Sequence, residues 1–298
     1  MPFSARFKQR FSEYGSLESG IEVERAFPPT PDGTRKLLLR LTSGPASGAQ
    51  VESVIIPMPG KGPRMTVCVS SQAGCAMNCQ GEPLDNERAT LQAIQILTHP
   101  LGADFALRRV CISTVGLVPA LRRLAAQTDA AIAVSLHATT DELRDWLVPV
   151  NRRHPLQELC AAMRDIFPRT HDHPNYRGRF VLVQYLLLAG VNDSEGDAAR
   201  LAELLAGVRC KINVLEFNPH PGTPFRRSQA AARFLETLRR CGHVATLRVS
   251  RGGERMAACG QLGELGRRGE PGTPLEPLPR LTKPPAQFSD RLAPPWHA

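Results

Sequence analysis

Two closely spaced cysteines are the residues whose type and spacing most directly suggest chemistry. Cys75 and Cys79 are separated by three residues in the segment CVSSQAGCAMNC, just beyond a predicted strand. Thiolates at this spacing can each ligate a metal ion or one corner of an iron–sulfur cluster. Two ordinary buried thiols are the alternative, and the pair alone does not decide between the two interpretations.

The elements that must position this segment alternate regularly. Runs rich in Val, Ile and Leu predict strands at 65–71, 109–114, 131–137, 180–188, 211–217 and 245–250, and helical periodicity predicts helices at 87–97, 118–126, 156–167, 194–205 and 228–241. Asn86, Asp193 and Ser228 are suitable helix starts. This alternation predicts an α/β fold with a parallel sheet, arranged as a partial barrel. We expect its chemistry at the carboxyl ends of the strands.

The remaining segments predict three regions. Segments 35–41 and 51–57, separated by SGPASGAQ, predict a β-hairpin within an N-terminal accessory region at 1–64. The partial barrel is expected at 65–265. The last 33 residues, 266–298, hold eight of the 26 prolines and predict a disordered or extended tail.

The composition describes a basic globular chain. A hydrophobic share of 42% excludes a mainly disordered protein, and a net charge of +9 favours a polyanionic partner such as RNA, DNA or an acidic membrane surface. No apolar stretch follows the basic start MPFSARFKQRF, and no run is long enough to span a membrane. We therefore expect a cytoplasmic protein with reduced cysteines.

Several long strings give the sequence a strong resemblance. TVCVSSQAGCAMNC, GEPLDN, STVGLVPALRRLA, AVSLHATTDELRDWLVPVNRR, GVNDS, CKINVLEFNPHPGTPF and AACGQL occur in this order, and the stretch from Glu52 to Leu262 closely resembles the RlmN/Cfr family of radical S-adenosylmethionine RNA methyltransferases. The resemblance implies a (βα)6-type partial barrel that holds a [4Fe–4S] cluster. It also implies methylation of an adenosine carbon in ribosomal RNA, and for some members in transfer RNA.

The resemblance implies roles for five residues. Cys75 and Cys79 match cluster ligands, and Cys259 matches the cysteine that first accepts a methyl group. Cys68 matches the thiol that releases the product by forming a transient disulfide with Cys259, and Glu52 matches the proton acceptor. Radical chemistry suits this reaction, because an aromatic C–H carbon is too weak a nucleophile for ordinary methyl transfer. A surface charge in the hairpin is the alternative for Glu52.

Other positions match the S-adenosylmethionine contacts of the family. They are strand-end or turn residues offering backbone, hydroxyl, carboxylate, imidazole or amide groups: Gly81, Glu82, Ser113, Ser135, Leu136, His137 and Asn218. Alone, each is more often a turn or cap residue, and His137 a core histidine. The resemblance further implies RNA as the partner, an electron donor such as flavodoxin, and a monomer.

The sequence departs from the family at the cluster. The family motif is CxxxCxxC, but here Cys79 is followed by Gln80 and Gly81, so the third cysteine is absent. A helix and a strand that the family has before GEPLDN are also missing, and one βα unit takes about 30 residues. Cys111 is the nearest spare thiol. Gln184 stands where the family usually has Glu.

Two hypotheses of different classes follow. One is a radical S-adenosylmethionine RNA methyltransferase of reduced activity or with a shortened sequence. The other is an inactive RNA- or nucleotide-binding relative that has lost the cluster. The presence of Cys68, Cys259 and Glu52 favours the enzyme, whereas the missing third cysteine favours the binding protein.

Overall fold

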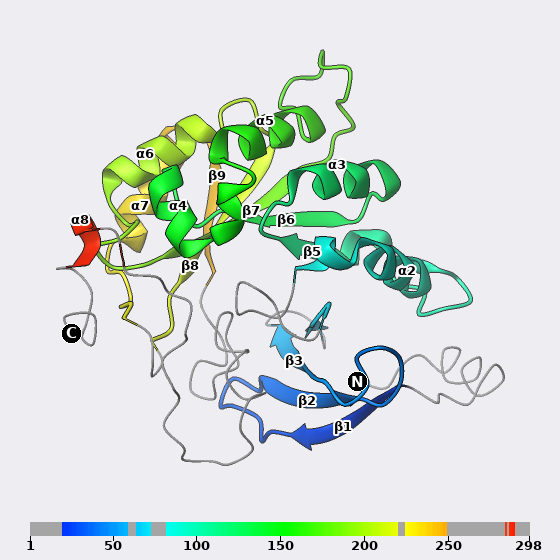
Figure 1. Ribbon diagram of the computed structural model, residues 1–298. Coiled ribbons are helices and arrows are strands. Elements are labelled where there is room, and N and C mark those ends of the chain that lie inside the picture. Colours follow the sequence, from blue (N-terminus) through cyan, green and yellow to red (C-terminus); the bar gives the residue numbers. More distant parts are fainter. Residues whose placement is uncertain are drawn as a thin grey trace. The chain divides into compact units, whose positions relative to one another are not determined.

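The computed structural model describes residues 20–58, 64–72, 82–219, 224–248, 284 and 286–289 (Figure 1). The chain forms two compact units, each described here by itself. Unit 1 comprises Met1–Ala106 with Arg251–Thr273, and unit 2 comprises Leu107–Ser250 with Pro274–Ala298. The division expected between residues 64 and 65 therefore falls inside unit 1.

Unit 1 contains a four-stranded antiparallel sheet in the order β1-β2-β3-β4. Its elements are β1 (Ile21–Ala26), β2 (Arg35–Leu41), β3 (Gln50–Met58), β4 (Arg64–Val69), the 3-10 helix η1 (Pro83–Asn86) and α2 (Glu87–Thr98). The predicted hairpin is confirmed, because β2 pairs with β3 with Leu38 opposite Glu52.

β4 differs from its sequence-based prediction. The segment 65–71 was expected to open the parallel barrel sheet, but β4 pairs antiparallel with β3, with Cys68 opposite Val54. Strand periodicity sets which residues share a face but does not select the partner strand, so the sequence pattern alone cannot distinguish these two arrangements.

Unit 2 is built around a five-stranded parallel sheet in the order β5-β6-β7-β8-β9. Its elements are η2 (Leu107–Arg109), β5 (Cys111–Thr114), α3 (Val118–Gln127), β6 (Ala131–Ser135), α4 (Asp141–Leu147), η3 (Pro149–Arg152), α5 (Leu156–Ile166), β7 (Val181–Leu187), α6 (Glu195–Leu204), β8 (Cys210–Glu216), α7 (Ala231–Arg240), β9 (Val244–Arg248) and α8 (Ala286–Ser289). The α/β partial barrel is thus confirmed as a fold class.

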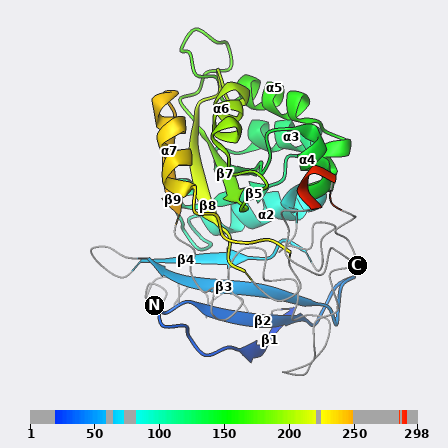
Figure 2. The same ribbon diagram turned by 90° about the vertical axis from the view of Figure 1, so that its left-hand side faces the viewer.

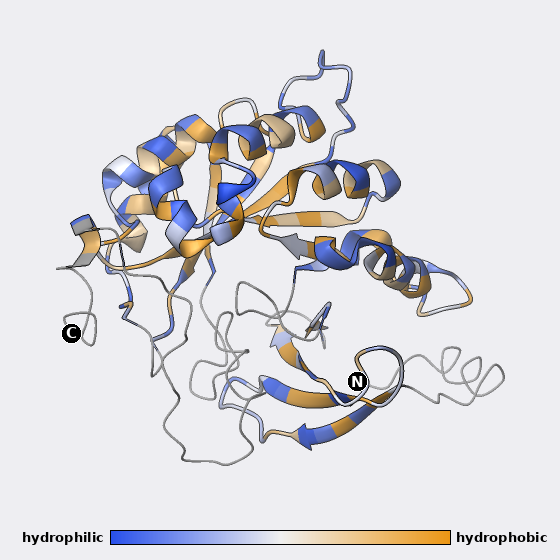
Figure 3. Ribbon diagram, viewed as in Figure 1, coloured by the Kyte–Doolittle hydropathy of each residue, from blue (hydrophilic) through white to orange (hydrophobic). Residues whose placement is uncertain are grey.

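The two faces of the parallel sheet differ sharply in burial. On β7, Val181, Val183, Tyr185 and Leu187 are fully buried and alternate with half-buried residues. Helices α3, α5, α6 and α7 lie against the buried face, which holds the core of unit 2 (Figures 1 and 2). These helices carry both hydrophobic and hydrophilic residues, as their amphipathic pattern predicts (Figure 3). We call the opposite face, which carries the half-buried residues of β7, the uncovered face because these four helices do not lie on it.

Helix starts and ends show which local predictions hold. The five predicted helices are present as α2, α3, α5, α6 and α7 within a few residues of their expected ends. Asn86 makes no side-chain cap bond, and Ser194 rather than Asp193 caps α6 through a reciprocal capping box with Asp197. α7 begins at Ala231, three residues after Ser228.

The Pro-rich tail also differs from its prediction over four residues. Ala286–Ser289 form α8, and the buried Phe288 stacks on Trp146 with ring centroids 6.3 Å apart. This contact needs an aromatic partner far away in the sequence, which local composition does not reveal. In the described part of the chain, no helix is long and apolar enough to cross a membrane.

Candidate active site

The predicted S-adenosylmethionine contacts of unit 2 lie at the carboxyl edge of the parallel sheet. Ser113 is the second-last residue of β5, Ser135 is the last residue of β6, and Asn218 follows the end of β8 by two residues. Parallel strands direct their carboxyl ends to one edge, so these groups share it as expected. The side chain of Asn218 is engaged there, because its Oδ1 accepts a hydrogen bond of 3.1 Å from Arg227.

The turn after β6 is held in an unusual conformation at His137. Its φ is +60°, a left-handed value that few residues other than glycine adopt. Its Nδ1 accepts the backbone N–H of Leu186 at 3.2 Å, and its carbonyl accepts from Nδ2 of Asn192 at 2.8 Å. Burial, followed by the charge of Arg144, lowers the pKa of His137 to about 4. The ring is therefore neutral at neutral pH, with its proton on Nε2.

Arg144 on α4 links the loops that follow β5 and β6. Its side chain is fully buried and donates to the carbonyls of Leu136 at 3.0 Å and Val115 at 2.6 Å, and to Oδ1 of Asn151 at 2.9 Å. The STVG and SLHATT segments are thereby held by one guanidinium. Sequence reasoning missed this residue, because an arginine on a short helix usually indicates a solvent-exposed face.

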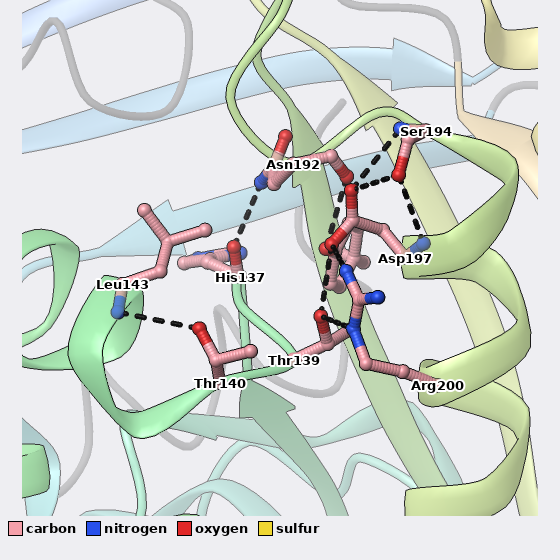
Figure 4. Close-up of polar contacts among 9 residues, drawn as sticks. His137, Thr139, Thr140, Leu143, Asn192, Ser194, Asp197 and Arg200 are labelled. Carbon is pink, nitrogen blue, oxygen red and sulfur yellow. Dashed lines mark hydrogen bonds and ion pairs between the residues drawn. The ribbon is translucent and has the colours of Figure 1, made fainter. Parts of the chain in front are cut away.

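A second network holds the loop that follows His137 (Figure 4). Thr139 donates to Oδ1 of Asp197 at 2.9 Å, and Arg200 forms an ion pair of 2.6 Å with the same oxygen. Asn192 bridges from its side chain to the carbonyls of His137 and Leu186, each at 2.8 Å. The GVNDS motif thus supports the turn at His137, a role that its turn-like composition did not indicate.

A row of polar side chains crosses the uncovered face beside this edge. Ser135 pairs in register with Gln184, Gln184 with Asn213, and Asn213 with Thr246. Thr246 donates to Oδ1 of Asn213 at 3.0 Å. Residues paired in register point to the same face, so these hydroxyls and amides form one polar band. Such a band suits a ligand with hydroxyl, amino and carboxylate groups.

Unit 1 places two of the predicted catalytic residues on one face of its sheet. Glu52 and Val54 share a face, and Cys68 lies opposite Val54, so Glu52 and Cys68 are diagonal neighbours, with backbones about 7 Å apart. Cys68 is half-buried beside Val54. Just after β4, the hydroxyl of Ser70 donates a hydrogen bond of 2.8 Å to the carbonyl of Glu52 on β3.

Glu52 forms a buried ion pair with Lys36. Lys36 Nζ lies 2.6 Å from Oε1 of Glu52, and both side chains are at most 7% exposed. Burial raises the pKa of Glu52, and Lys36 partly opposes that effect. The second carboxylate oxygen, Oε2, is buried without a hydrogen-bond partner in the described structure. The alternative of a surface charge is therefore excluded.

Glu82 and the cysteines complete the predicted set. Glu82 is buried, and its Oε1 accepts the N–H of Leu84 at 3.1 Å, so it caps η1.

Cys75, Cys79, Gly81 and Cys259 lie outside the described residues. Among the described residues, no three His, Cys, Asp or Glu side chains gather as a metal site. Cys111 begins β5 and is exposed on the face of Ser113.

Comparison with known proteins gives the class first. A radical SAM methyltransferase from Sphaerobacter thermophilus has a similar structure, with a TM-score of 0.72 and 36% sequence identity, covering 81% of each chain. The fold and this similarity define a protein of the radical SAM methyltransferase class. No protein-family model matches the chain.

Two curated relatives then give the family. The RlmN dual-specificity RNA methyltransferase of Syntrophobacter fumaroxidans is 37% identical, covering 83% of this chain and 82% of its own length. The same enzyme of Syntrophotalea carbinolica is 38% identical, covering 78% and 70%. The chain belongs to the RlmN family.

The first alignment also measures what this chain lacks. It runs over 295 positions but covers 83% of the 298 residues here, which is about 247 residues. The difference between 295 and 247 leaves about 48 positions of the relative with no counterpart in this chain. A βα unit takes about 30 residues, so the difference is large enough for the unit that the sequence was predicted to lack.

Proposed function

We propose that this chain methylates a carbon atom of adenosine in ribosomal RNA, with transfer RNA as a second substrate, through a cysteine that carries the methyl group. The family and the names of the relatives support RNA methylation. The observation that carries the finer proposal is the placement of Glu52 and Cys68 on one face of the sheet of unit 1. A protein that only binds RNA has no need for this pair.

The residues of the carboxyl edge fit S-adenosylmethionine. When bound, this cofactor supplies the methyl group and, in this family, the radical. The hydroxyls of Ser113 and Ser135 lie at the strand ends, and the polar row from Ser135 to Thr246 offers further hydrogen-bonding groups. The neutral ring of His137 holds the turn and would add no positive charge to a site that holds a cationic sulfonium.

Glu52 is the group that we assign to proton removal. The ring carbon must lose its proton once it carries the new substituent, and a carboxylate within hydrogen-bond reach can accept it. Burial raises the pKa of Glu52, which makes the carboxylate a better base, and Lys36 orients it through Oε1. We assign the proton to Oε2, which is buried without a hydrogen-bond partner among the described residues, so the carboxylate must become accessible before it can accept the proton.

Cys68 is the group that we assign to product release. Its thiolate attacks the sulfur of Cys259, so that a disulfide forms and the bond from that sulfur to the methylene carbon breaks. The electron pair stays with the carbon, which takes up a proton and becomes the methyl group. Such an exchange requires a thiolate at Cys68.

The residues present do not fit an iron–sulfur cluster as they fit S-adenosylmethionine. Two cysteines, Cys75 and Cys79, stand in the cluster segment, and the third cysteine of the family motif is absent from the sequence there. We therefore derive no step through a cluster. This departure favours the second candidate, an inactive relative that binds RNA or a nucleotide.

The test uses the full chain, reconstituted anaerobically with iron and sulfide and incubated with RNA, S-adenosylmethionine and a reductant. We expect methyladenosine in digested RNA by mass spectrometry, and none from Cys259→Ala. Cys68→Ala should leave RNA covalently attached to the protein, whereas Cys241→Ala, which changes an exposed thiol after α7, should resemble the wild type. RNA binding without any methyladenosine would favour the inactive relative.

A further inference from the structure

The amino edge of the parallel sheet contains a cavity that the methylation chemistry does not use. Its volume is about 570 Å³, and its polar and aromatic lining comprises Arg169, His171, Tyr176, Phe180, Arg209 and Lys211. It lies where β7, β8 and β9 begin. Seven residues of β8 separate this edge from the carboxyl edge, a distance of about 20 Å.

Three cations in the lining are held by uncharged partners. The guanidinium of Arg209 lies 5.3 Å from the ring centroid of Tyr176 and donates to its hydroxyl, and Lys211 Nζ lies 4.4 Å from the ring centroid of Phe180. Arg169 donates to the carbonyl of Gly242 at 3.2 Å. Aromatic faces and carbonyls orient a cation but leave its charge uncompensated.

Two other arginines of unit 2 are paired with carboxylates, unlike the cations of this cavity. Arg122 pairs with Asp165, and Arg179 pairs with Asp129 at 2.8 Å. Within the described ranges, no carboxylate forms an ion pair with Arg169, Arg209 or Lys211. Three positive charges therefore face one cavity.

The other titratable groups of the lining do not cancel this charge. Burial raises the pKa of the Cys210 thiol to about 12, so the thiol remains protonated and neutral. Burial lowers the pKa of His243, whose Nε2 lies 3.1 Å from the carbonyl of Ala202. The charge of the cavity thus comes from its arginines and its lysine.

We propose that this cavity binds the phosphodiester backbone of RNA, at a contact about one strand length away from the carboxyl edge. Planar guanidinium groups match phosphate oxygens, and a cavity of this volume admits a nucleotide rather than a phosphate group alone. The inference rests on the proposed function for the identity of the polyanion as RNA. A second contact of this kind would orient a large RNA whose reacting base lies at the other edge.

The test compares two double variants with the same change in charge. Arg169→Gln with Lys211→Gln removes two cations of the cavity, whereas Arg122→Gln with Arg233→Gln removes two exposed arginines that do not line it. Affinity for a single-stranded RNA is measured by fluorescence anisotropy over a range of salt concentrations. Binding needs neither cofactor nor turnover, so this result is independent of whether methylation occurs.

We expect the cavity variant to lose at least tenfold in affinity and its salt slope to fall by about 1.4, which is the loss of two phosphate contacts on a single strand. The control pair should lose less than threefold, and Lys211→Arg should bind RNA like the wild type. Equal losses in the two double variants would overturn the proposal. AMP or inorganic phosphate binding at the cavity as tightly as RNA would overturn it in favour of a small-anion site.

Discussion

At the scale of single residues, His137 is a predicted S-adenosylmethionine contact that also stabilises the turn after β6. Its left-handed φ, its ring nitrogen and its carbonyl are each held by a different part of unit 2. Residues in sparsely populated conformations persist only where the surroundings enforce them, and they concentrate at functional sites. The strain at His137 therefore supports a functional role for this turn.

Asparagine in place of His137 should change the pH dependence of stability. The unfolded chain takes up the proton near pH 6.5 and the folded chain near 4, so stability falls as the pH falls through this window. His137→Asn keeps a side chain that tolerates positive φ but does not titrate. Between pH 7 and 5 the wild type should lose about 2 kcal/mol more than the variant in urea unfolding. Parallel pH profiles would contradict the neutral buried ring.

The ion pair of Lys36 and Glu52 gives a second prediction at this scale. Removing one partner leaves a buried charge uncompensated, so Lys36→Met and Glu52→Gln should each cost about 3 kcal/mol of unfolding free energy in unit 1. The double variant removes both charges and should cost much less than the sum of the two. Denaturant unfolding of all four proteins measures the coupling, and additive losses would show that the two side chains do not interact.

At the scale of elements, α4 matters more than its length suggests. Its Arg144 donates three hydrogen bonds to the carbonyls of Leu136, Val115 and Ser135 at the ends of β5 and β6, and a fourth to Asn151 in η3. Burial lowers the pKa of Arg144 to about 10, so its charge persists at neutral pH. A helix of seven residues thus positions both serines of the carboxyl edge.

Lysine cannot reproduce the planar fork of Arg144. Arg144→Lys should therefore destabilise unit 2 by about 3 kcal/mol and speed amide hydrogen exchange in segments 113–117 and 135–138. Arg153→Lys, a similar change at an exposed site nearby, should leave both unchanged. Unchanged exchange in the Arg144 variant would contradict its positioning role.

The same elements show how far local sequence signals extend. α3 and α5 were predicted closely because ten or eleven residues give several turns of helical periodicity. α4 was missed because seven residues give barely two turns, and its start, SLHATT, was interpreted only as a motif. The strand positions of Ser113 and Ser135 followed from their hydrophobic neighbours. The buried links of Arg144, Asn192 and Lys36 did not, because they depend on residues brought together by the fold.

At the scale of the whole molecule, the sheet topology agrees with a shortened barrel. Among the described strands, β5 lies at one edge of the five-stranded parallel sheet, while the cysteine-bearing strand β4 pairs in the sheet of unit 1. A strand from the missing unit would pair with that edge. About 48 aligned positions of the relative have no counterpart in this chain, which is enough for one such βα unit.

The most direct test of the methyltransferase assignment measures bound iron and methyladenosine in one anaerobically reconstituted sample. We expect methyladenosine that depends on Cys259, with bound iron below the about four atoms per chain of an intact cluster, because the cluster segment has two cysteines instead of three. A colourless, iron-free protein that binds RNA and forms no methyladenosine would contradict the assignment.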